Sequence, residues 1–398
     1  MGGAVVALNC GSTSVKFAAY ACNDARSLAP LCRGSVDGIE ENPRFAVEDA
    51  SHRPLDAHAW GPGHPIDPET ALHFTLTWIE EHLTTKIGAV GHRIVLGGTR
   101  YSEPVLLDDT VLAYLDSLVL VDASHQPHNL AAVRAVAQAF PHLPQVACFD
   151  TSFHRTMPEL AQIYALPQKA RDAGVRHYGF HGISYDYISR QLPRYAPQAH
   201  RVIAAHLGGG ASVCAMLDGK SLETSMGFGG ISGLPMSTRC GDVPADALLY
   251  LLRSKVYDDA TLEKALYEES GLLGLSGFSE DMHVLQASAD PRARTAVAYF
   301  VYALVKYIGA YAAVLGGLDA LVFTGGIGEH SAPVRAAVCT KLDWLGLTLD
   351  ETTNAHNGPT ISTEGSRVSA WVIPTDEQLM IAQHTVALAP HDASSGKA

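Results

Sequence analysis

The chain has 398 residues, of which 47% are hydrophobic and 17% charged, and its 28 basic and 41 acidic side chains give a net charge of −13. This composition excludes a mainly disordered protein, and the length predicts about two domains with sizeable cores. Because an acidic balance disfavours contact with nucleic acid or an anionic membrane, we expect neither as a partner.

The cysteines and the N-terminus indicate the compartment. The seven cysteines are scattered and contain no C-x-x-C pair, which is typical of a reducing environment. The first ten residues, MGGAVVALNC, lack the basic region and long apolar stretch of a signal peptide. The sequence contains no run of about 18 apolar residues, so no membrane span is predicted. We therefore expect a cytoplasmic protein.

Two distant stretches share a strand–turn–strand pattern. Residues 5–8 and 15–20 read as strands around a small polar turn, and residues 202–217 repeat the arrangement, with Gly11 opposite Gly208. The second hairpin continues through an Asp-Gly turn into a third strand. The repeat predicts a duplicated domain; chance similarity between two hairpins is the alternative.

Strands alternate with helices along the rest of the chain, which predicts an α/β protein with mixed sheets. Further strands are expected at 89–95, 145–149, 201–206, 319–324 and 368–373, and helices at 68–82, 128–139, 245–253, 294–315, 331–341 and 376–387. Residues 42–68 read as a surface insertion, 293–315 as a helix buried all round, and 390–398 as a frayed tail.

Three loops rich in glycine or serine follow strands. They are residues 9–16, which end on Lys16, residues 206–210 with three consecutive glycines, and residues 323–330, which lead to the helix cap Ser331. Backbone N–H groups in such loops bind phosphate oxygens, although a plain hairpin turn or a crowded domain junction explains each loop alone. Together they favour a nucleotide site.

Polar residues occur where strands should end, at Arg93, Asp150, His181, Arg239 and Glu377. Cations beside carboxylates are typical of phosphoryl-transfer sites. Helix caps, a satisfied core histidine or structural ion pairs are the alternatives at single positions. A capping box from Thr375 to Gln378 is expected before the last helix. A metal pair of His177 and His181 is disfavoured, since the intervening glycines oppose a helix.

These motifs resemble the acetokinase family of the actin/hexokinase/Hsp70 superfold over nearly the whole chain. The resemblance rests on NCGSTSVKF (9–17), GHRIVLGG (91–98), FDTSFHRTMP (149–158), HYGFHGIS (177–184), HLGGGAS (206–212), SMGF (225–228), MSTRCGD (236–242), FTGGIGE (323–329) and PTDEQL (374–379). It implies two duplicated actin-like (ribonuclease H-like) domains with mixed sheets flanked by helices and an active site in the cleft between them. The implied domains are residues 1–149 plus 381–398, and residues 150–380, the second of which binds nucleotide and forms a homodimer.

The resemblance also implies an activity, namely reversible, direct in-line transfer of a phosphoryl group from ATP to acetate, giving acetyl phosphate and ADP. Its implied catalytic residues are Arg93, Asp150, His181 and Arg239, and its implied ligands of Mg²⁺ (or Mn²⁺) are Asn9 and Glu377. The acyl group would contact Arg93, Val95, Ser124, His125, Phe180 and Gly230. The nucleotide would lie along Lys16, His206, Leu207, Gly208, Gly209, Gly210, Asp281, Met282, His283, Gly326, Ile327, Gly328, Glu329 and His330.

Several residues depart from the family pattern. Gly209 stands where the family has Asn, and His283 where it has Arg, so weaker or pH-dependent nucleotide contacts are expected. Ser124 and Gly230 replace a Leu and a Pro in the acyl pocket, which leaves space for propionate. Propionate or butyrate kinase activity and a non-catalytic, nucleotide-sensing protein are therefore the alternatives. Since a carboxylate is already a nucleophile at neutral pH, Asp150 is expected to orient the site.

Overall fold

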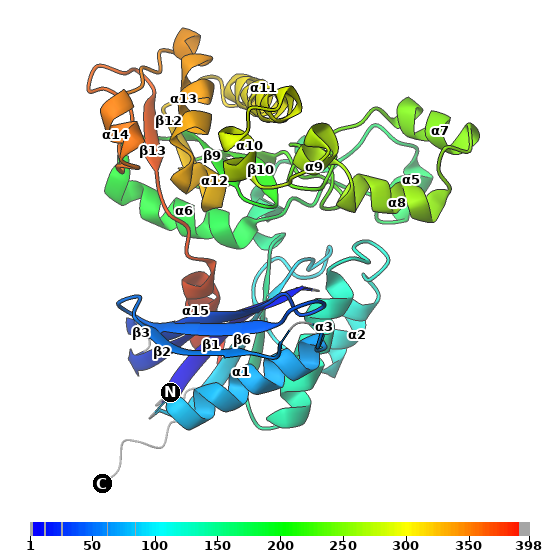
Figure 1. Ribbon diagram of the computed structural model, residues 1–398, viewed down its shortest axis with the longest axis vertical. Helices are drawn as coiled ribbons and strands as arrows, with labels where there is room; N and C mark the ends of the chain where they lie inside the picture. Colours follow the sequence, from blue (N-terminus) through cyan, green and yellow to red (C-terminus); the bar gives the residue numbers. More distant parts are fainter. Residues whose placement is uncertain (1–2, 12, 25–26, 62, 84, 390–398) are drawn as a thin grey trace. The chain divides into compact units, whose positions relative to one another are not determined.

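The computed structural model describes residues 3–11, 13–24, 27–61, 63–83 and 85–389 (Figure 1). The chain divides into two compact units, Met1–Ser152 with Asp376–Ala398, and Phe153–Thr375. The sequence-based boundaries were placed after residues 149 and 380, whereas in the structure Asp150 and Glu377 belong to the first unit. The expected frayed tail 390–398 lies outside the described residues.

The first unit holds an eight-stranded mixed sheet with the order β5-β4-β3-β2-β1-β6-β8-β7. Its strands are β1 (Gly3–Cys10), β2 (Ser14–Asp24), β3 (Ser27–Asp37), β4 (Arg44–Asp49), β5 (Pro54–Ala59), β6 (Ile87–Ile94), β7 (Val105–Leu106) and β8 (Gln145–Phe149). Its helices are α1 (Pro68–His82), α2 (Asp109–Asp116), α3 (Gln126–Ala139) and α15 (Glu377–Leu388), and the 3₁₀ turn η1 (Ser152–Thr156) begins at its end.

Helices cover both faces of this sheet. Leu72, Leu76 and Ile79 of α1 join Phe17 and Phe45 of the strands in one core. On the other face α15 packs so closely on β6 that a Cβ added to Gly91 would overlap the side chains of Thr385 and Ile381. Glycine at this position therefore lets the last helix settle on the sheet, and with it the start of α15 at Glu377.

The second unit holds a five-stranded mixed sheet with the order β11-β10-β9-β12-β13. Its strands are β9 (Arg201–Leu207), β10 (Ala211–Leu217), β11 (Lys220–Thr224), β12 (Ala320–Thr324) and β13 (Ser369–Val372). Its helices are α4 (Glu159–Gln162), α5 (Gln168–Asp172), α6 (Gly182–Tyr195), α7 (Ala245–Arg253), α8 (Asp259–Glu268), α9 (Gly271–Ser276), α10 (Met282–Ala287), α11 (Pro291–Val314), α12 (Gly325–His330), α13 (Ala332–Thr340) and α14 (Glu351–Ala355), with the turn η2 (Asp343–Leu345).

The two sheets share one connectivity. In each, three antiparallel strands (β3-β2-β1 and β11-β10-β9) continue through two parallel strands (β6-β8 and β12-β13). The order β3-β2-β1-β6-β8 in the first sheet thus corresponds to the order β11-β10-β9-β12-β13 in the second. This confirms the predicted α/β fold with mixed sheets and the duplicated domain, and it excludes chance similarity between two hairpins.

Three local expectations were wrong. Residues 42–68 contain the hairpin β4–β5, which extends the first sheet because each strand of the hairpin pairs antiparallel with its neighbour. The glycine-rich stretch after β12 forms the short helix α12, which Gly325 enters with φ +75°. Helix α11 was expected to be buried all round. Phe300, Leu304 and Ile308 are buried, but Tyr302 is 64% exposed.

Helix α11 is the one helix among the described residues that is long and apolar enough to cross a membrane, and a third of its most apolar stretch is buried. Its buried residues face α9, α10 and α13 and strands β9 and β10 of its own unit. A core helix of a globular unit has the same composition, so α11 is weak evidence for a span.

Two fully buried histidines predict an acid-sensitive fold. Burial lowers the pKa of both His92 and His154 to about 4. His92 Nε2 donates a hydrogen bond to Gln145 Oε1 at 2.7 Å. The unfolded chain therefore binds more protons below pH 6.5, and stability present above this pH falls progressively toward pH 4. We expect each histidine to contribute up to about 3 kcal/mol of this loss. Thermal unfolding followed between pH 7.5 and 4.5 measures it. A His92→Gln variant should show a shallower pH slope, and an unchanged slope would contradict the assignment.

Candidate active site

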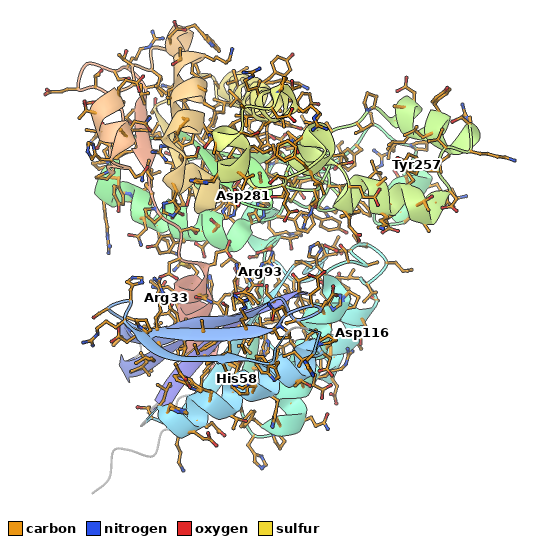
Figure 2. The ribbon with its side chains drawn as sticks, viewed as in Figure 1. Arg33, His58, Arg93, Asp116, Tyr257 and Asp281 are labelled. Atoms are coloured by element: carbon orange, nitrogen blue, oxygen red, sulfur yellow. The ribbon has the colours of Figure 1, made fainter. Side chains whose placement is uncertain are left out.

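Parallel strands of the first sheet bring Asn9, Arg93 and Asp150 together. Asn9 lies near the end of β1, Arg93 near the end of the adjacent β6, and Asp150 directly after β8, the next parallel strand. Arg93, labelled in Figure 2, donates from Nε to Asp150 Oδ2 at 2.9 Å and from Nη2 to the same oxygen at 2.5 Å. Its Nη1 donates to Asn9 Oδ1 at 3.1 Å. The carboxyl ends of adjacent strands thus form one polar centre.

Several carboxylates surround this arginine. Burial alone would lower the pKa of Arg93, but the charges of Asp150, Glu377 and Asp122 raise it above its usual value. Glu377 is the first residue of α15, and Asp376 caps that helix by accepting from Leu379 N at 2.9 Å. The expected capping box from Thr375 to Gln378 was therefore wrong. Arg93 is held as a permanent cation among carboxylates.

A loop before α3 lies near the same centre. Asp122 Oδ1 accepts from Ser124 Oγ at 3.0 Å, from His125 N at 3.0 Å and from His125 Nδ1 at 2.9 Å. Burial would raise the pKa of Asp122, but these hydrogen bonds and the charge of His125 hold it below its usual value. Ser124 and His125 are thereby fixed by one buried carboxylate that the sequence did not single out.

Asn129 of α3 is a second residue that sequence reasoning missed. Its Oδ1 accepts from Val95 N at 3.0 Å, and its Nδ2 donates to Cys10 O at 2.7 Å. One buried amide thus links the segments that follow β1 and β6. Its position on α3, three residues after the buried Gln126 and among the apolar residues of the same face, offered the only signal in the sequence.

Lys16 lies on the strand next to Asn9. It lies on β2 opposite Asn9 of β1 and lines a cavity of about 430 Å³ on the open part of the sheet. Arg33, Ser35, Asp56 and Gln378 line the same cavity. The lysine is exposed, so its ammonium is accessible to an anion.

In the second unit two imidazoles stack beside the triple glycine. The rings of His181 and His206 have centroids 4.4 Å apart and lie 27° from parallel. His181 Nδ1 is 2.9 Å from Ser212 Oγ, and His206 Nδ1 is 2.9 Å from Ser184 Oγ. A Cβ added to Gly210 would lie 3.1 Å from His181 Nε2, so this nitrogen faces the glycine loop.

Arg239 lies on the loop between β11 and α7 and is half-buried. Its Nη1 donates to Gly230 O at 2.9 Å, and a Cβ added to Gly230 would lie 3.0 Å from the same nitrogen. Glycine therefore lets the guanidinium approach the backbone. Phe180, whose carbonyl accepts from His154 Nε2 at 2.9 Å, is buried next to His181.

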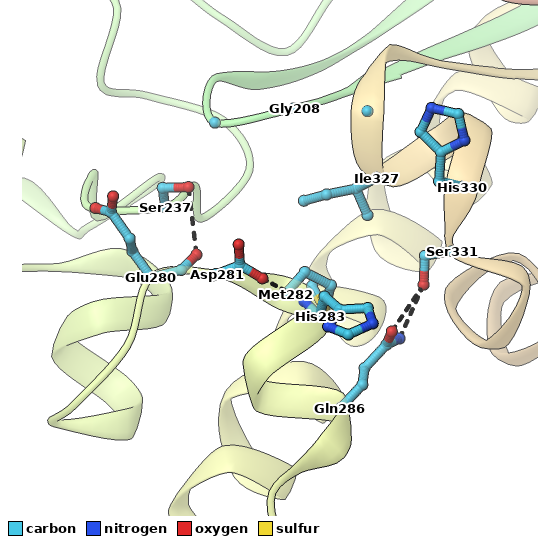
Figure 3. Close-up of a pocket in the computed structure, with 12 residues that line it drawn as sticks. Gly208, Ser237, Glu280, Asp281, Met282, His283, Gln286, Ile327, His330 and Ser331 are labelled. Atoms are coloured by element: carbon cyan, nitrogen blue, oxygen red, sulfur yellow. Dashed lines mark hydrogen bonds between the residues drawn. The ribbon is translucent and has the colours of Figure 1, made fainter. Parts of the chain in front are cut away.

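A cavity of about 410 Å³ opens beside the glycine loop (Figure 3). Its lining includes Gly208, Gly209, Asp281, Met282, His283, Gly326, Ile327 and His330 of the predicted nucleotide residues, together with Ser237, Glu280, Gln286 and Ser331. Asp281 Oδ1 caps α10 by accepting from His283 N at 2.7 Å. Gln286 and Ser331 exchange hydrogen bonds of 2.9 and 3.1 Å across the cavity. The size and mixed lining suit a nucleoside.

Glu329 and Arg335 act on the backbone around this cavity. Glu329 Oε1 accepts from Gly325 N at 2.9 Å and from Thr375 N at 3.1 Å, so its carboxylate braces α12. Arg335 is fully buried and donates to the carbonyls of Gly328 and Glu329 at 2.8 and 3.0 Å. Sequence reasoning missed Arg335, since an arginine predicts an exposed side chain, whereas here it lies on the buried face of α13 with Val338 and Cys339.

Comparisons with known proteins identify the family. The model of the acetokinase family matches residues 4–383. The chain is 46% identical over 393 residues to an acetate kinase of Nitrobacter hamburgensis, with 98% of this chain and 97% of that protein covered. Among solved structures, a propionate kinase from Francisella tularensis has a TM-score of 0.89 at 34% identity and covers 97% and 100% of the two chains. The acetate kinase of Porphyromonas gingivalis has a TM-score of 0.85 at 33% identity and covers 97% and 99%. The chain is therefore a kinase of the acetokinase family.

Proposed function

We propose that this enzyme transfers the γ-phosphoryl group of ATP to acetate, reversibly and by direct in-line attack, to give acetyl phosphate and ADP. The observation that carries the proposal is the Arg93–Asp150–Asn9 centre at the strand ends of one unit, in a member of a kinase family. The second unit adds a nucleoside-sized cavity beside a triple glycine. A cation, carboxylates and backbone N–H groups are the parts that phosphoryl transfer needs.

Arg93 binds the acetate carboxylate in this proposal, and Asp150 orients the guanidinium. The acid needs no general base, because acetate is ionised at neutral pH. Contacts with the acyl group are assigned in this proposal to Val95, Ser124 and His125 of the first unit, and to Phe180 and Gly230 of the second. Arg239 and His181 donate to the oxygens of the transferring phosphoryl group, where charge accumulates.

The oxygen donors Asn9, Asp150 and Glu377 fit a hard cation such as Mg²⁺ (or Mn²⁺). The described residues contain no cluster of three or more His, Cys, Asp or Glu side chains able to hold a metal alone. Mg²⁺ is commonly bound through one or two carboxylates, waters and substrate phosphates, so this donor set suits it. Asn9 and Glu377 would hold the ion, which neutralises phosphate charge when bound. The protein's part is to keep these oxygens beside Arg93.

The nucleotide lies in the cavity beside Gly208 in this proposal, with its phosphates along residues 206–210. Lys16 of the first unit, whose ammonium is exposed, is proposed as a further contact of the phosphates. Gly209 offers only backbone to the phosphates, and His283 presents a shorter side chain than arginine at the cavity wall. We therefore expect a raised KM for ATP that a His283→Arg substitution lowers.

The experiment that tests the proposal is an acyl-hydroxamate assay with MgATP and acetate, propionate or butyrate. We expect acetate to give the highest kcat/KM. One methylene changes the selectivity by about 10–200-fold, which the assay resolves. Higher kcat/KM with propionate would favour the second candidate, supported by Gly230 and Ser124 in the acyl pocket and by the similarity to a propionate kinase. No signal with any acid would leave the nucleotide-sensing alternative.

A substitution in the glycine loop tests the role of His181. In Gly210→Ala the new Cβ would lie 3.1 Å from His181 Nε2, so the imidazole must shift by a few tenths of an ångström. We expect kcat to fall about tenfold, because small displacements of positioned groups are costly. In the matched variant Gly209→Ala the nearest atom is Ser237 Oγ at 3.8 Å, so kcat should change less. Equal effects on kcat would contradict this role.

We further propose a homodimer formed through the second unit. Helix α7, all of which is described, has no buried residue, yet its sequence ADALLYLLR is largely apolar, and Tyr250 is 67% exposed. Such a face is typical of a protein interface. Sedimentation should give twice the chain mass, and Tyr250→Lys with Leu249→Lys should give monomers. The seven cysteines, all within the described ranges, form no disulfide with one another, which supports a cytoplasmic location.

A further inference from the structure

His181 is held in an uncommon backbone conformation from which its side chain has few alternatives. It is the N-cap residue of α6, with φ 59° and ψ 22°. Gly179, two residues earlier, also has a positive φ, 81°. A non-glycine residue in the left-handed region costs about 1–2 kcal/mol, and such strain persists where the surroundings impose it. The imidazole is thereby directed between Ser212 and the glycine loop.

A chain of buried hydroxyls reaches the inner nitrogen of this ring. Tyr185 Oη lies 2.5 Å from Ser212 Oγ, which lies 2.9 Å from His181 Nδ1. Both Tyr185 and Ser212 have no exposed surface. Burial raises the pKa of the Tyr185 phenol well above its usual value, so the phenol keeps its proton.

The phenol determines the direction of this chain. A buried O–H group donates to the acceptor beside it, and for the protonated Tyr185 phenol this acceptor is Ser212 Oγ at 2.5 Å. Ser212 then directs its proton at His181 Nδ1, which accepts. An imidazole that accepts at Nδ1 carries its proton at Nε2 when neutral. That nitrogen is the one facing Gly210.

We propose that Tyr185 and Ser212 are positioning residues that fix His181 as the neutral Nε2–H tautomer. This inference rests on the proposed function, in which His181 contacts the transferring phosphoryl group. His181 then donates a hydrogen bond without adding a positive charge, and the positive charge at the phosphoryl group comes from Arg239. The neighbouring His206 is held in a similar way, since Ser184 Oγ lies 2.9 Å from both His206 Nδ1 and Thr375 Oγ1.

The test is the ¹⁵N spectrum of the free full-length enzyme labelled in its imidazole nitrogens, with the His181 signals assigned by comparison with His181→Gln. At pH 8 the wild type should show a protonated Nε2 and an unprotonated Nδ1. Ser212→Ala should shift both signals toward a mixture of tautomers. Ser221→Ala is the matched control, because it removes a similar bond, 2.8 Å from Ser221 Oγ to His154 Nδ1, and should leave the His181 signals unchanged.

Kinetics supply the second readout. Ser212→Ala should lower kcat about tenfold, the worth of one neutral hydrogen bond, while the KM for ATP stays within about twofold. Tyr185→Phe should lower kcat less, because Ser212 keeps its hydroxyl. A wild-type ring protonated at Nδ1, or the same tautomer in Ser212→Ala, overturns the proposal even if a variant folds poorly. Because the spectra need no substrate, a failure of the proposed function in the hydroxamate assay is distinguishable from a failure here.

Discussion

An Arg93→Ala enzyme is expected to lose about 10²–10³ in kcat/KM for acetate, because truncating one partner of a buried charge pair, here the cation proposed to bind the acetate carboxylate, costs about 2–5 kcal/mol. The guanidinium contacts both Asp150 and Asn9. The substitution therefore removes the cation proposed to bind acetate, and it also removes the hydrogen-bond partner of the Asp150 carboxylate. Steady-state kinetics in the presence of MgATP measure the loss. Near-normal turnover by a folded Arg93→Ala enzyme would refute the assignment.

Stability provides the control for this variant. Asp150 is 1% exposed, so Arg93→Ala leaves a buried charge without its cation and should cost about 3–5 kcal/mol of unfolding free energy. The double variant Arg93→Ala/Asp150→Asn removes that charge and should regain stability without regaining activity. Arg93→Lys keeps the charge but not the forked geometry, and should remain strongly impaired.

Replacing Arg239 by alanine is expected to have the second large effect, a loss of about 10³ or more in kcat. Its Nη1 donates a hydrogen bond to Gly230 O, and thermal unfolding of the variant checks that it is folded. The KM for ATP should change far less than kcat, because the arginine acts on the transferring group. Arg190→Ala, which removes an exposed arginine paired with Asp186 in the same unit, is the matched control and should keep full activity. A kcat for Arg239→Ala within tenfold of wild type would contradict the role.

Nine strands (β1, β2, β6 and β8–β13) and six of the helices (α1, α3, α7, α11, α13 and α15) could be predicted from sequence because their patterns are local. The apolar run of β1, the Asp-Gly turn after β10 and the cap at Ser331 each act within a few residues, and Ser331 Oγ accepts from Val334 N at 3.4 Å as expected. The hairpin β4–β5 was not predicted, although Phe45 and Val47 of β4 are buried in alternation with exposed residues; β5 is exposed throughout at the edge of the sheet. Edge strands lack the apolar alternation on which sequence reasoning depends.

The site could be predicted only in part. The glycine loops and the polar residues at strand ends stand out in the sequence, because their residue types are unusual for those positions. Asn129 and Arg335 do not, because Asn129 donates to Cys10 O and Arg335 to Asn354 O, groups that lie well apart from them in the chain. Residues whose role comes from long-range hydrogen bonds carry no periodic or motif signal. The chain order alone also gave no reason to connect Tyr185 with His181 through Ser212.

The ³¹P NMR spectrum of the purified enzyme with MgATP and acetate tests the central claim most directly. The account predicts an acetyl phosphate resonance that grows together with ADP, requires acetate, and disappears when excess ADP and a trap for ATP drive the reaction backward. Inorganic phosphate as the only product would contradict it, as would an unchanged spectrum with protein shown to be folded.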